Sequence, residues 1–239
     1  ARPPADRLRG AKIVAHRGVH DNRRVMENTL AAFEAAATTG VWGVELDVRW
    51  TRDGQAVVCH DADLMRVFGL PASLAALTFN QLRRRCPLVP ALSEVVDRFG
   101  GRLHLMIELK NLPNPSHTYP YRQLAERLEA LRPVRDYHLI TLVPPLLAEV
   151  HWAPEACLPI ARLRSRGFSR LALERGYAGV CGHYAFLGSR RLNRCHHRGQ
   201  RTGTGFIASE ASLYREVNRG VTWLFSNHAV EMQKLCLGA

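Results

Sequence analysis

Short apolar runs with strand character alternate with helical stretches along most of this chain, and this alternation restricts the possible folds more than any other feature. Strands joined by helices form βαβ units, which build parallel sheets. Eight or so such strands in 239 residues predict an α/β fold, the (β/α)8 TIM barrel. The predicted strands are residues 12–15, 44–48, 56–59, 104–109, 137–142, 158–162, 178–181, 204–208 and 221–225.

Helical stretches fill the intervals between the strands. The first opens at residues 27–29, where Asn28 or Thr29 can cap the free amides, and it ends at Gly40. A capping-box spacing at residues 78–81 marks another, after a segment of little order at residues 62–79. Further helices are expected near residues 92–99, 121–131, 145–150, 169–175, 189–198, 212–219 and 227–235.

Composition sets the scale of the fold. With 46% hydrophobic residues, the chain can bury one sizeable core. No linker, low-complexity tract or internal repeat interrupts the pattern, so we expect one domain over residues 1–239. No apolar run approaches the roughly 18 residues that a membrane span needs.

The acidic residues Glu45 and Asp47 alternate with Val44, Leu46 and Val48, which is the period-two pattern of a strand. Both carboxylates therefore lie on one face, close enough to converge on a small cation. An edge hairpin with a solvated acidic face is the simpler alternative. The apolar neighbours of the two acids argue against it, because they indicate burial on at least one side.

A hairpin over residues 44–60 is predicted from Asp53-Gly54, which lies between two strand-like runs. A two-residue loop would pair Asp47 with His60, whereas a four-residue loop would pair Glu45 with His60. Both registers place the histidine on the carboxylate face, since directly opposed residues share a side of the sheet.

The carboxyl ends of the strands are where a parallel barrel gathers its chemistry. Four predicted strand ends carry polar groups: His16 with Arg17, Glu45 with Asp47, His60 with Asp61, and Glu108 with Lys110. The three acids Glu45, Asp47 and Glu108 would repel one another unless a cation neutralised them. Because all their ligand atoms are oxygens, Mg²⁺ or Ca²⁺ is favoured over zinc.

The remaining groups at these strand ends fit displacement at phosphorus. A bound cation would hold a phosphate oxygen, Arg17 would grip the phosphoryl group with two donors, and Lys110 would add a point charge. Of the two imidazoles, one would take a proton from the attacking hydroxyl and the other would give one to the leaving oxygen. His16 and His60 are the candidates. A lone histidine is more often structural, but two at strand tips beside acids favour catalysis.

Charge and cysteines suggest the setting. The formal net charge of +12 and the pI of about 10.1 imply attraction to anions. Arginines are spread along the chain, which favours a solvated basic surface, with a weak attraction to anionic membranes, over a dedicated nucleic-acid stripe. The six cysteines lack a C-x-x-C pair, so we expect buried reduced thiols and a cytoplasmic location. Because the chain starts at Ala1, we also expect a processed or trimmed N-terminus.

The order and spacing of these motifs resemble the glycerophosphodiester phosphodiesterase family. The likeness covers residues 12–110, whereas beyond residue 140 it is weak and depends on residues 221–227. The motifs are His16-Arg17-Gly18, Glu27-Asn28-Thr29, Glu45-Leu46-Asp47, Thr51-Arg52-Asp53-Gly54, His60-Asp61, Val89-Pro90-Ala91-Leu92 with Glu94, and Glu108-Leu109-Lys110.

The resemblance implies a TIM barrel that uses Mg²⁺ or Ca²⁺ to hydrolyse glycerophosphodiesters, such as deacylated phospholipids, to glycerol 3-phosphate and an alcohol. In the family's usual picture the neighbouring glycerol hydroxyl attacks first, and water then opens the cyclic phosphate. The implied roles are His16 and His60 as acid and base, Arg17 and Lys110 on the phosphate, and Glu45, Asp47 and Glu108 on the metal.

Three departures from the family concern substrate choice. Met26 replaces a usual proline, and residues 62–104 are short for the insertion that often caps the site, so a reduced cap is expected. Residues 205–209 stand where the family often has a tryptophan, so one glycerol-side contact should differ. Two alternatives stay open: a lysophospholipase D-like or phosphoinositide-type phosphodiesterase, and, ranked lower, a catalytically inactive basic binding module.

Overall fold

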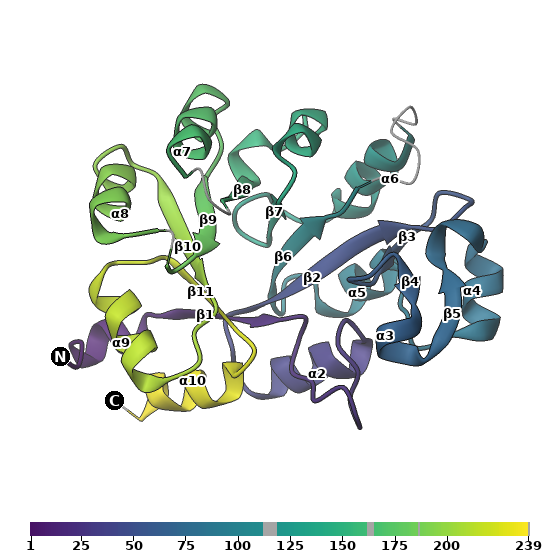
Figure 1. The fold of residues 1–239 in the computed structure, drawn as a ribbon, viewed down its shortest axis with the longest axis horizontal. Coiled ribbons are helices and arrows are strands. Elements are labelled where there is room, and N and C mark those ends of the chain that lie inside the picture. The colour runs from purple at the N-terminus through teal and green to yellow at the C-terminus, as the bar shows by residue number, and fades with distance from the viewer. Residues whose placement is uncertain (112–118, 162–164, 186, 239) are drawn as a thin grey trace.

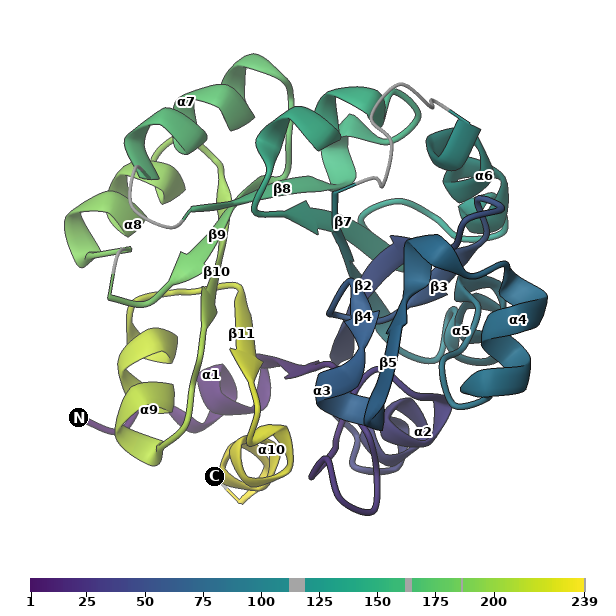
Figure 2. The same cartoon turned by 45° about the vertical axis from the view of Figure 1, so that its right-hand side comes forward.

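The computed structural model describes residues 1–111, 119–161, 165–185 and 187–238. In this part of the chain, eight parallel strands form a closed ring in which β1 pairs with both β2 and β11 (Figures 1 and 2). The strands are β1 (Lys12–His16), β2 (Gly43–Trp50), β6 (His104–Leu109), β7 (Tyr137–Thr141), β8 (Cys157–Ala161), β9 (Gly179–His183), β10 (Arg201–Gly205) and β11 (Trp223–Ser226). The predicted (β/α)8 TIM barrel is confirmed.

Helices surround the ring of strands (Figure 2). The helices are α1 (Ala5–Arg9), α2 (Leu30–Thr38), α4 (Phe79–Arg85), α5 (Leu92–Phe99), α6 (Tyr119–Leu128), α7 (Ser165–Glu174), α8 (Ser189–His196), α9 (Glu210–Asn218) and α10 (Ala229–Leu237). None of those in the described segments is long and apolar enough to cross a membrane. The predicted capping box is present, with Thr78 and Gln81 exchanging bonds.

Between β7 and β8 the predicted helix at residues 145–150 is replaced by two 3₁₀ segments, η2 (Pro144–Glu149) and η3 (Pro154–Ala156). Prolines occupy the first positions of both segments, and short 3₁₀ turns commonly serve as connectors of this kind. The last residue of the predicted strand 158–162 lies outside the described residues.

The core has two layers, as the alternation of side chains along each strand requires. Inside the barrel, Val14, Met106, Ile140, Leu158 and Trp223 form one cluster. The outward-facing residues of the strands pack against the helices in a larger one. All six cysteines are buried free thiols, as predicted.

The hairpin forms, but neither predicted register is right. Strand β3 (Ala56–Val58) pairs antiparallel with β2 so that Val48 faces Val58, which leaves a five-residue loop at residues 51–55. The Thr51 hydroxyl closes this wider loop by accepting a hydrogen bond from the amide of Gln55 at 3.1 Å. Because β3 ends at Val58, His60 lies beyond the ladder, where strand alternation does not fix its direction.

The segment at residues 62–79 is ordered, contrary to the prediction. It contains β4 (Asp63–Leu64), α3 (Met65–Phe68), β5 (Leu70–Ser73) and η1 (Leu74–Ala76), with its own small apolar cluster against β3. Elements of two to four residues are too short to show a readable periodicity, so tertiary packing sets this structure. The segment places Arg66 beside the mouth of the barrel, as its contacts described below show.

Candidate active site

Strand register brings the predicted acids and the first histidine together. In the β1–β2 pair His16 lies opposite Glu45, and in the β2–β6 pair Asp47 lies opposite Glu108. Glu45, Asp47 and Glu108 are buried, and each offers an oxygen within 4.8 Å of the others. His16 Nε2 lies 3.7 Å from Glu45 Oε2. Residues 92 positions apart in the chain thus share one cluster, as the sequence predicted.

Burial makes this acidic cluster electrostatically costly. Burial raises the pKa of Glu45 well above its ordinary range, and the charges of Asp47 and Glu108 add to the effect. The pKa of Glu108 is also raised, by burial and then by Asp47. Burial would raise the pKa of Asp47 too, but Lys110 and Arg17 outweigh it, so this pKa is lowered.

A hard divalent cation fits this cluster. Glu45 Oε1 is buried and accepts no hydrogen bond from any described residue. An oxygen in that situation is stabilised by a cation, which would also relieve the repulsion among the three acids. The donors are all carboxylate oxygens, the ligands that Mg²⁺ and Ca²⁺ prefer.

Both predicted phosphate-binding cations reach the acids. Lys110 Nζ donates to Glu108 Oε1 at 2.5 Å and lies 2.8 Å from Asp47 Oδ1. An ammonium has three N–H donors, so one remains for a ligand. Arg17 follows β1 in the left-handed region with φ 59°, and its amide donates to Glu45 Oε2 at 3.1 Å. Its Nε lies 3.4 Å from Asp47 Oδ2.

His16 is oriented by the last strand of the barrel. Its Nδ1 lies 2.6 Å from Oδ1 of Asn227, which follows β11. If that oxygen accepts, Nδ1 carries the proton and Nε2 keeps a lone pair toward Glu45. Burial, followed by the charge of Arg17, lowers the pKa of His16 to about 4. A neutral imidazole of this kind can accept a proton.

His60 is oriented by its neighbour Asp61, whose Oδ1 lies 2.7 Å from His60 Nδ1. Burial lowers the pKa of His60, although the charge of Asp47 and the bond to Asp61 oppose the shift. The backbone brings this segment close to the acids, because the amide of Cys59 donates to the carbonyl oxygen of Asp47 at 2.9 Å. The other six predicted site residues form one network of contacts, and His60 is linked to it through Asp61 and Arg66, as described below.

Asn28 holds Asp47 in place, a role that the sequence did not reveal. Its Nδ2 donates to Asp47 Oδ2 at 2.7 Å, and its Oδ1 accepts from the Asp47 amide at 3.3 Å. Thr29, the other predicted cap, does cap α2 by accepting from the amide of Ala32. Asn28 has φ 58°, in the left-handed region that asparagine tolerates better than most residues. An asparagine just before the helix was therefore the only sign in the sequence of its special position.

Arg66 and Glu27 connect Arg17 to the His60–Asp61 pair, and neither role was predicted. Arg66 Nη2 donates to Glu27 Oε1 at 2.6 Å, and its Nε donates to Asp61 Oδ2 at 2.5 Å. Arg17 Nη1 donates to the same Glu27 oxygen at 2.9 Å. Burial would raise the pKa of Glu27, but bonds from Arg66 and Asn22 and the charge of Arg17 lower it to about 2. Glu27 therefore remains ionised and links Arg17 to the His60–Asp61 pair.

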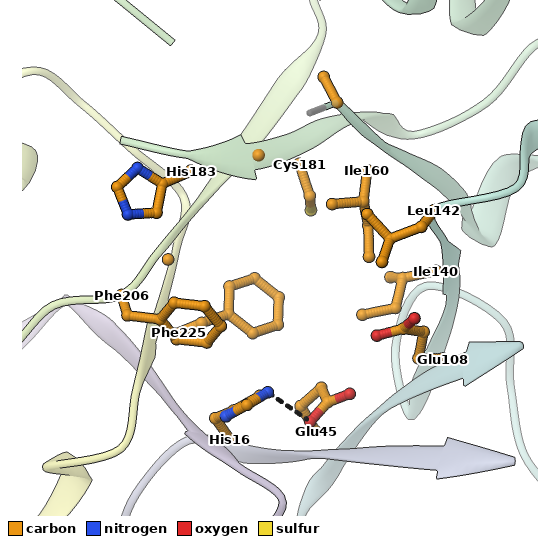
Figure 3. A pocket seen from close by; sticks show the side chains of 13 residues that line it. His16, Glu45, Glu108, Ile140, Leu142, Ile160, Cys181, His183, Phe206 and Phe225 are labelled. Atoms are coloured by element: carbon orange, nitrogen blue, oxygen red, sulfur yellow. Dashed lines mark ion pairs between the residues drawn. The ribbon is translucent and has the colours of Figure 1, made fainter. Parts of the chain in front are cut away.

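A cavity of about 270 Å³ opens beside His16, Glu45 and Glu108 (Figure 3). Its far wall comes from the ends of β7 to β11 and includes Leu142 and Phe206. Phe206 belongs to residues 205–209, the stretch in which the family often has a tryptophan. Its ring centroid lies 4.6 Å from that of His16.

The fold and this mouth define a class of protein: a (β/α)8 barrel with a buried carboxylate cluster, an imidazole and two cations at the carboxyl ends of its strands. Residues 16–162 match the model of the glycerophosphoryl diester phosphodiesterase family, which is more than half of the chain. The chain belongs to this family.

Individual relatives agree with that assignment. The chain is 35% identical over 120 residues to a glycerophosphodiester phosphodiesterase of Bacillus altitudinis, and the match covers 46% of this chain and 48% of the relative. It is 44% identical over 85 residues to human glycerophosphodiester phosphodiesterase 1, covering 35% of this chain and 24% of the relative. The chain thus spans about half the length of the first relative and less of the second.

Solved structures show the same fold over nearly the whole chain. A phosphodiesterase of Oleispira antarctica, in complex with the product sn-glycerol-3-phosphate, aligns with a TM-score of 0.81 at 21% identity, covering 95% of this chain and 97% of that one. The glycerophosphodiester phosphodiesterase of Thermotoga maritima aligns with a TM-score of 0.80 at 22% identity, covering 94% and 98%.

Proposed function

We propose that this protein is a metal-dependent phosphodiesterase that hydrolyses glycerophosphodiesters to glycerol 3-phosphate and an alcohol. The observation that carries the proposal is the buried cluster of Glu45, Asp47 and Glu108 with the imidazole of His16 beside it. The second imidazole, His60, is oriented by Asp61. Family membership and the product named for the Oleispira antarctica neighbour support the same reaction.

In this proposal the three acids hold Mg²⁺ or Ca²⁺. The unpartnered Glu45 Oε1 supports this role, as do the raised pKa values of Glu45 and Glu108. When bound, the cation supplies stabilisation for negative charge that develops at the phosphate.

The phosphate of the substrate is bound by Arg17 and Lys110. The contacts of Arg17 to Glu27 and Asp47 use its Nη1 and Nε, and a guanidinium has five N–H donors in a rigid fork. Lys110 adds its remaining N–H. Because the acids fix both cations before substrate arrives, little orientational freedom is lost on binding.

The two histidines move the protons. His16, neutral at pH 7 because of its lowered pKa, is suited to take the proton from the attacking hydroxyl through Nε2. His60 is the candidate acid in its protonated form, because the carboxylate of Asp61 at Nδ1 stabilises the imidazolium whose Nε2–H would be donated to the leaving oxygen. In the second step water opens the cyclic phosphate, and the two histidines can exchange the roles of acid and base.

A catalytically inactive binding module is the weaker alternative. Such a module would have no physical need for three acids buried in one cluster, which is costly to fold. It would instead bind anions with an affinity that falls steeply with salt concentration, and it would form no metal-dependent product.

Release of glycerol 3-phosphate from glycerophosphocholine, measured with and without a chelator, tests the proposal. We expect release that a chelator abolishes and that excess Mg²⁺ or Ca²⁺ restores. Release that persists in the chelator would contradict the metal, and absence of release with either ion would contradict the reaction.

A further inference from the structure

A basic groove lies on the outside of the barrel, between α7 and α8, which run side by side (Figures 1 and 2). Its volume is about 380 Å³, and its lining includes the buried residues Val180 and Cys195. Val180 of β9 faces this groove, whereas its neighbour Cys181 lines the cavity inside the barrel, as the alternation of a strand requires. The groove is therefore separate from the candidate active site.

Four arginines line this groove, and they come from both helices. Arg191 and Arg194 lie one turn apart on α8, Arg198 lies in the turn that follows this helix, and Arg170 belongs to α7. The series from α8 extends over on the order of 10 Å, given the rise of a helix. Gly167 of α7 leaves the groove open, because a Cβ at this position would meet no atom within 4 Å.

Few carboxylates balance these charges. Residues 175–209 contain six arginines and no aspartate or glutamate. Arg170 lies 3.6 Å from Glu174. In the described parts of the chain, no carboxylate lies within ion-pair distance of Arg194 or Arg198. Like charges gathered in a groove repel one another, so a bound anion would stabilise this arrangement.

The shape of the groove selects among anions. A concave lining can enclose a small molecule, whereas a lipid bilayer presents a broad surface. Each guanidinium can hold a phosphate group with two parallel N–H donors. The row of arginines is longer than one phosphate group, so a chain of two or three phosphates would contact more of them than orthophosphate could.

We infer that the groove between α7 and α8 is a second ligand site, which binds a small molecule carrying a diphosphate or triphosphate group. Arg194 and Arg198 would obtain from this ligand the ion pairs that the described carboxylates do not give them. The inference is independent of the proposed function, because none of the described residues that line the groove also lines the cavity at the barrel mouth.

Calorimetry on the full chain tests the inference, with orthophosphate, pyrophosphate and tripolyphosphate as probes at one ionic strength. A chelator is present throughout, so that no divalent cation links a probe to the acids of the mouth. We expect tripolyphosphate to bind at least about tenfold more tightly than orthophosphate, because it reaches more guanidinium groups. ATP is titrated alongside, and its affinity relative to tripolyphosphate distinguishes an esterified chain from a free one. Equal affinities for orthophosphate and tripolyphosphate would overturn the inference.

Variants locate the bound anion. Arg194→Gln/Arg198→Gln removes two charges from the groove, and Arg84→Gln/Arg85→Gln removes two exposed arginines of α4 outside it. We expect the affinity for tripolyphosphate to fall at least about tenfold in the first variant and to stay unchanged in the second. Equal affinities in the two variants would mean that no built site selects the anion. Circular dichroism verifies that both variants are folded.

A membrane surface is the competing occupant of a basic groove. Sedimentation with phosphatidylglycerol vesicles, compared with phosphatidylcholine vesicles, measures this attraction. We expect any binding to the anionic vesicles to be equally strong in the wild type and in Arg194→Gln/Arg198→Gln. Vesicle binding that requires these two arginines, together with no binding of tripolyphosphate, would identify the groove as a membrane contact and overturn the inference.

Discussion

The two sides of the barrel mouth come from different parts of the chain and carry different chemistry. The ends of β1, β2 and β6 provide acids, an imidazole and cations, whereas the ends of β7 to β11 provide mainly aliphatic and aromatic side chains. In the first half the side chains fix one another through ion pairs and hydrogen bonds. In the second half they are held by packing. The difference suggests that the first half determines the reaction and the second half determines which substrates fit.

Glu45→Gln is the strongest test of the charged half. The change keeps the shape of the side chain but removes one of the three charges that would hold the cation. We expect loss of tight metal binding by calorimetry and a fall in kcat of at least about 10³-fold, since electrostatic stabilisation is often the largest catalytic contribution. Glu34→Gln, which alters a half-buried acid of α2 paired with Arg98, is the matched control and should titrate like the wild type. Unchanged metal titration in Glu45→Gln would contradict the assignment.

The histidines allow the two halves to be compared directly. His16→Ala or His60→Ala should each lower kcat by at least about 10²-fold through lost proton transfer, with the fold intact. His183 lines the same cavity from the apolar half, at the end of β9. His183→Ala should change kcat much less, and its main effect should be on KM. A loss as large as that of His16→Ala would mean that the chemistry is not confined to one half.

Arg66 should have a smaller effect because it acts through other residues. It contacts Asp61 and Glu27, which in turn hold His60 and Arg17. We expect Arg66→Met to lower kcat about tenfold, with a shifted pH profile, as a lost orienting contact typically does. Arg66→Lys should restore part of the rate because it keeps the charge. If both variants match the wild type in kcat and pH profile, Arg66 is not a positioning residue.

The sequence predicted the charged half better than the apolar half, for physical reasons. Acids and histidines at strand ends are visible because strand period and barrel topology together fix where they point, as with Glu45 and Glu108. The hairpin register was wrong because the Thr51 side chain, rather than Asp53-Gly54 alone, sets the loop length.

The residues that sequence reasoning missed act through contacts between distant segments. Arg66 belongs to elements too short for a periodic pattern, and Asn227 meets His16 across 211 positions. The apolar side of the cavity could not be predicted either, because a leucine or isoleucine at the end of a strand is equally typical of a residue buried in the core. Only the arrangement of five strands shows that these side chains face a cavity (Figure 3).

Low pH should destabilise the charged half more than the apolar half, and this effect on stability is the smallest that we predict. The pKa of Glu27 is about 2 in the fold against an ordinary value of 4.5, so its contribution to stability is present above pH 4.5 and is lost as the pH falls toward 2. Glu27→Gln should lower the free energy of unfolding at pH 7 by about 1 to 3 kcal/mol, because Arg17 and Arg66 lose a charged partner.

The control lies in the apolar half. Ile140→Val removes one methyl group from a buried residue of β7 and should cost about 1 kcal/mol. Urea unfolding of both variants at pH 7 and at pH 3 distinguishes the two kinds of stabilisation. The free-energy cost of Glu27→Gln should be smaller at pH 3 than at pH 7. Below pH 4.5 the wild-type Glu27 carboxylate contributes less to stability, so its removal costs less. The cost of Ile140→Val should stay constant, because no proton is involved. If the two costs change in parallel with pH, the halves do not differ in what stabilises them.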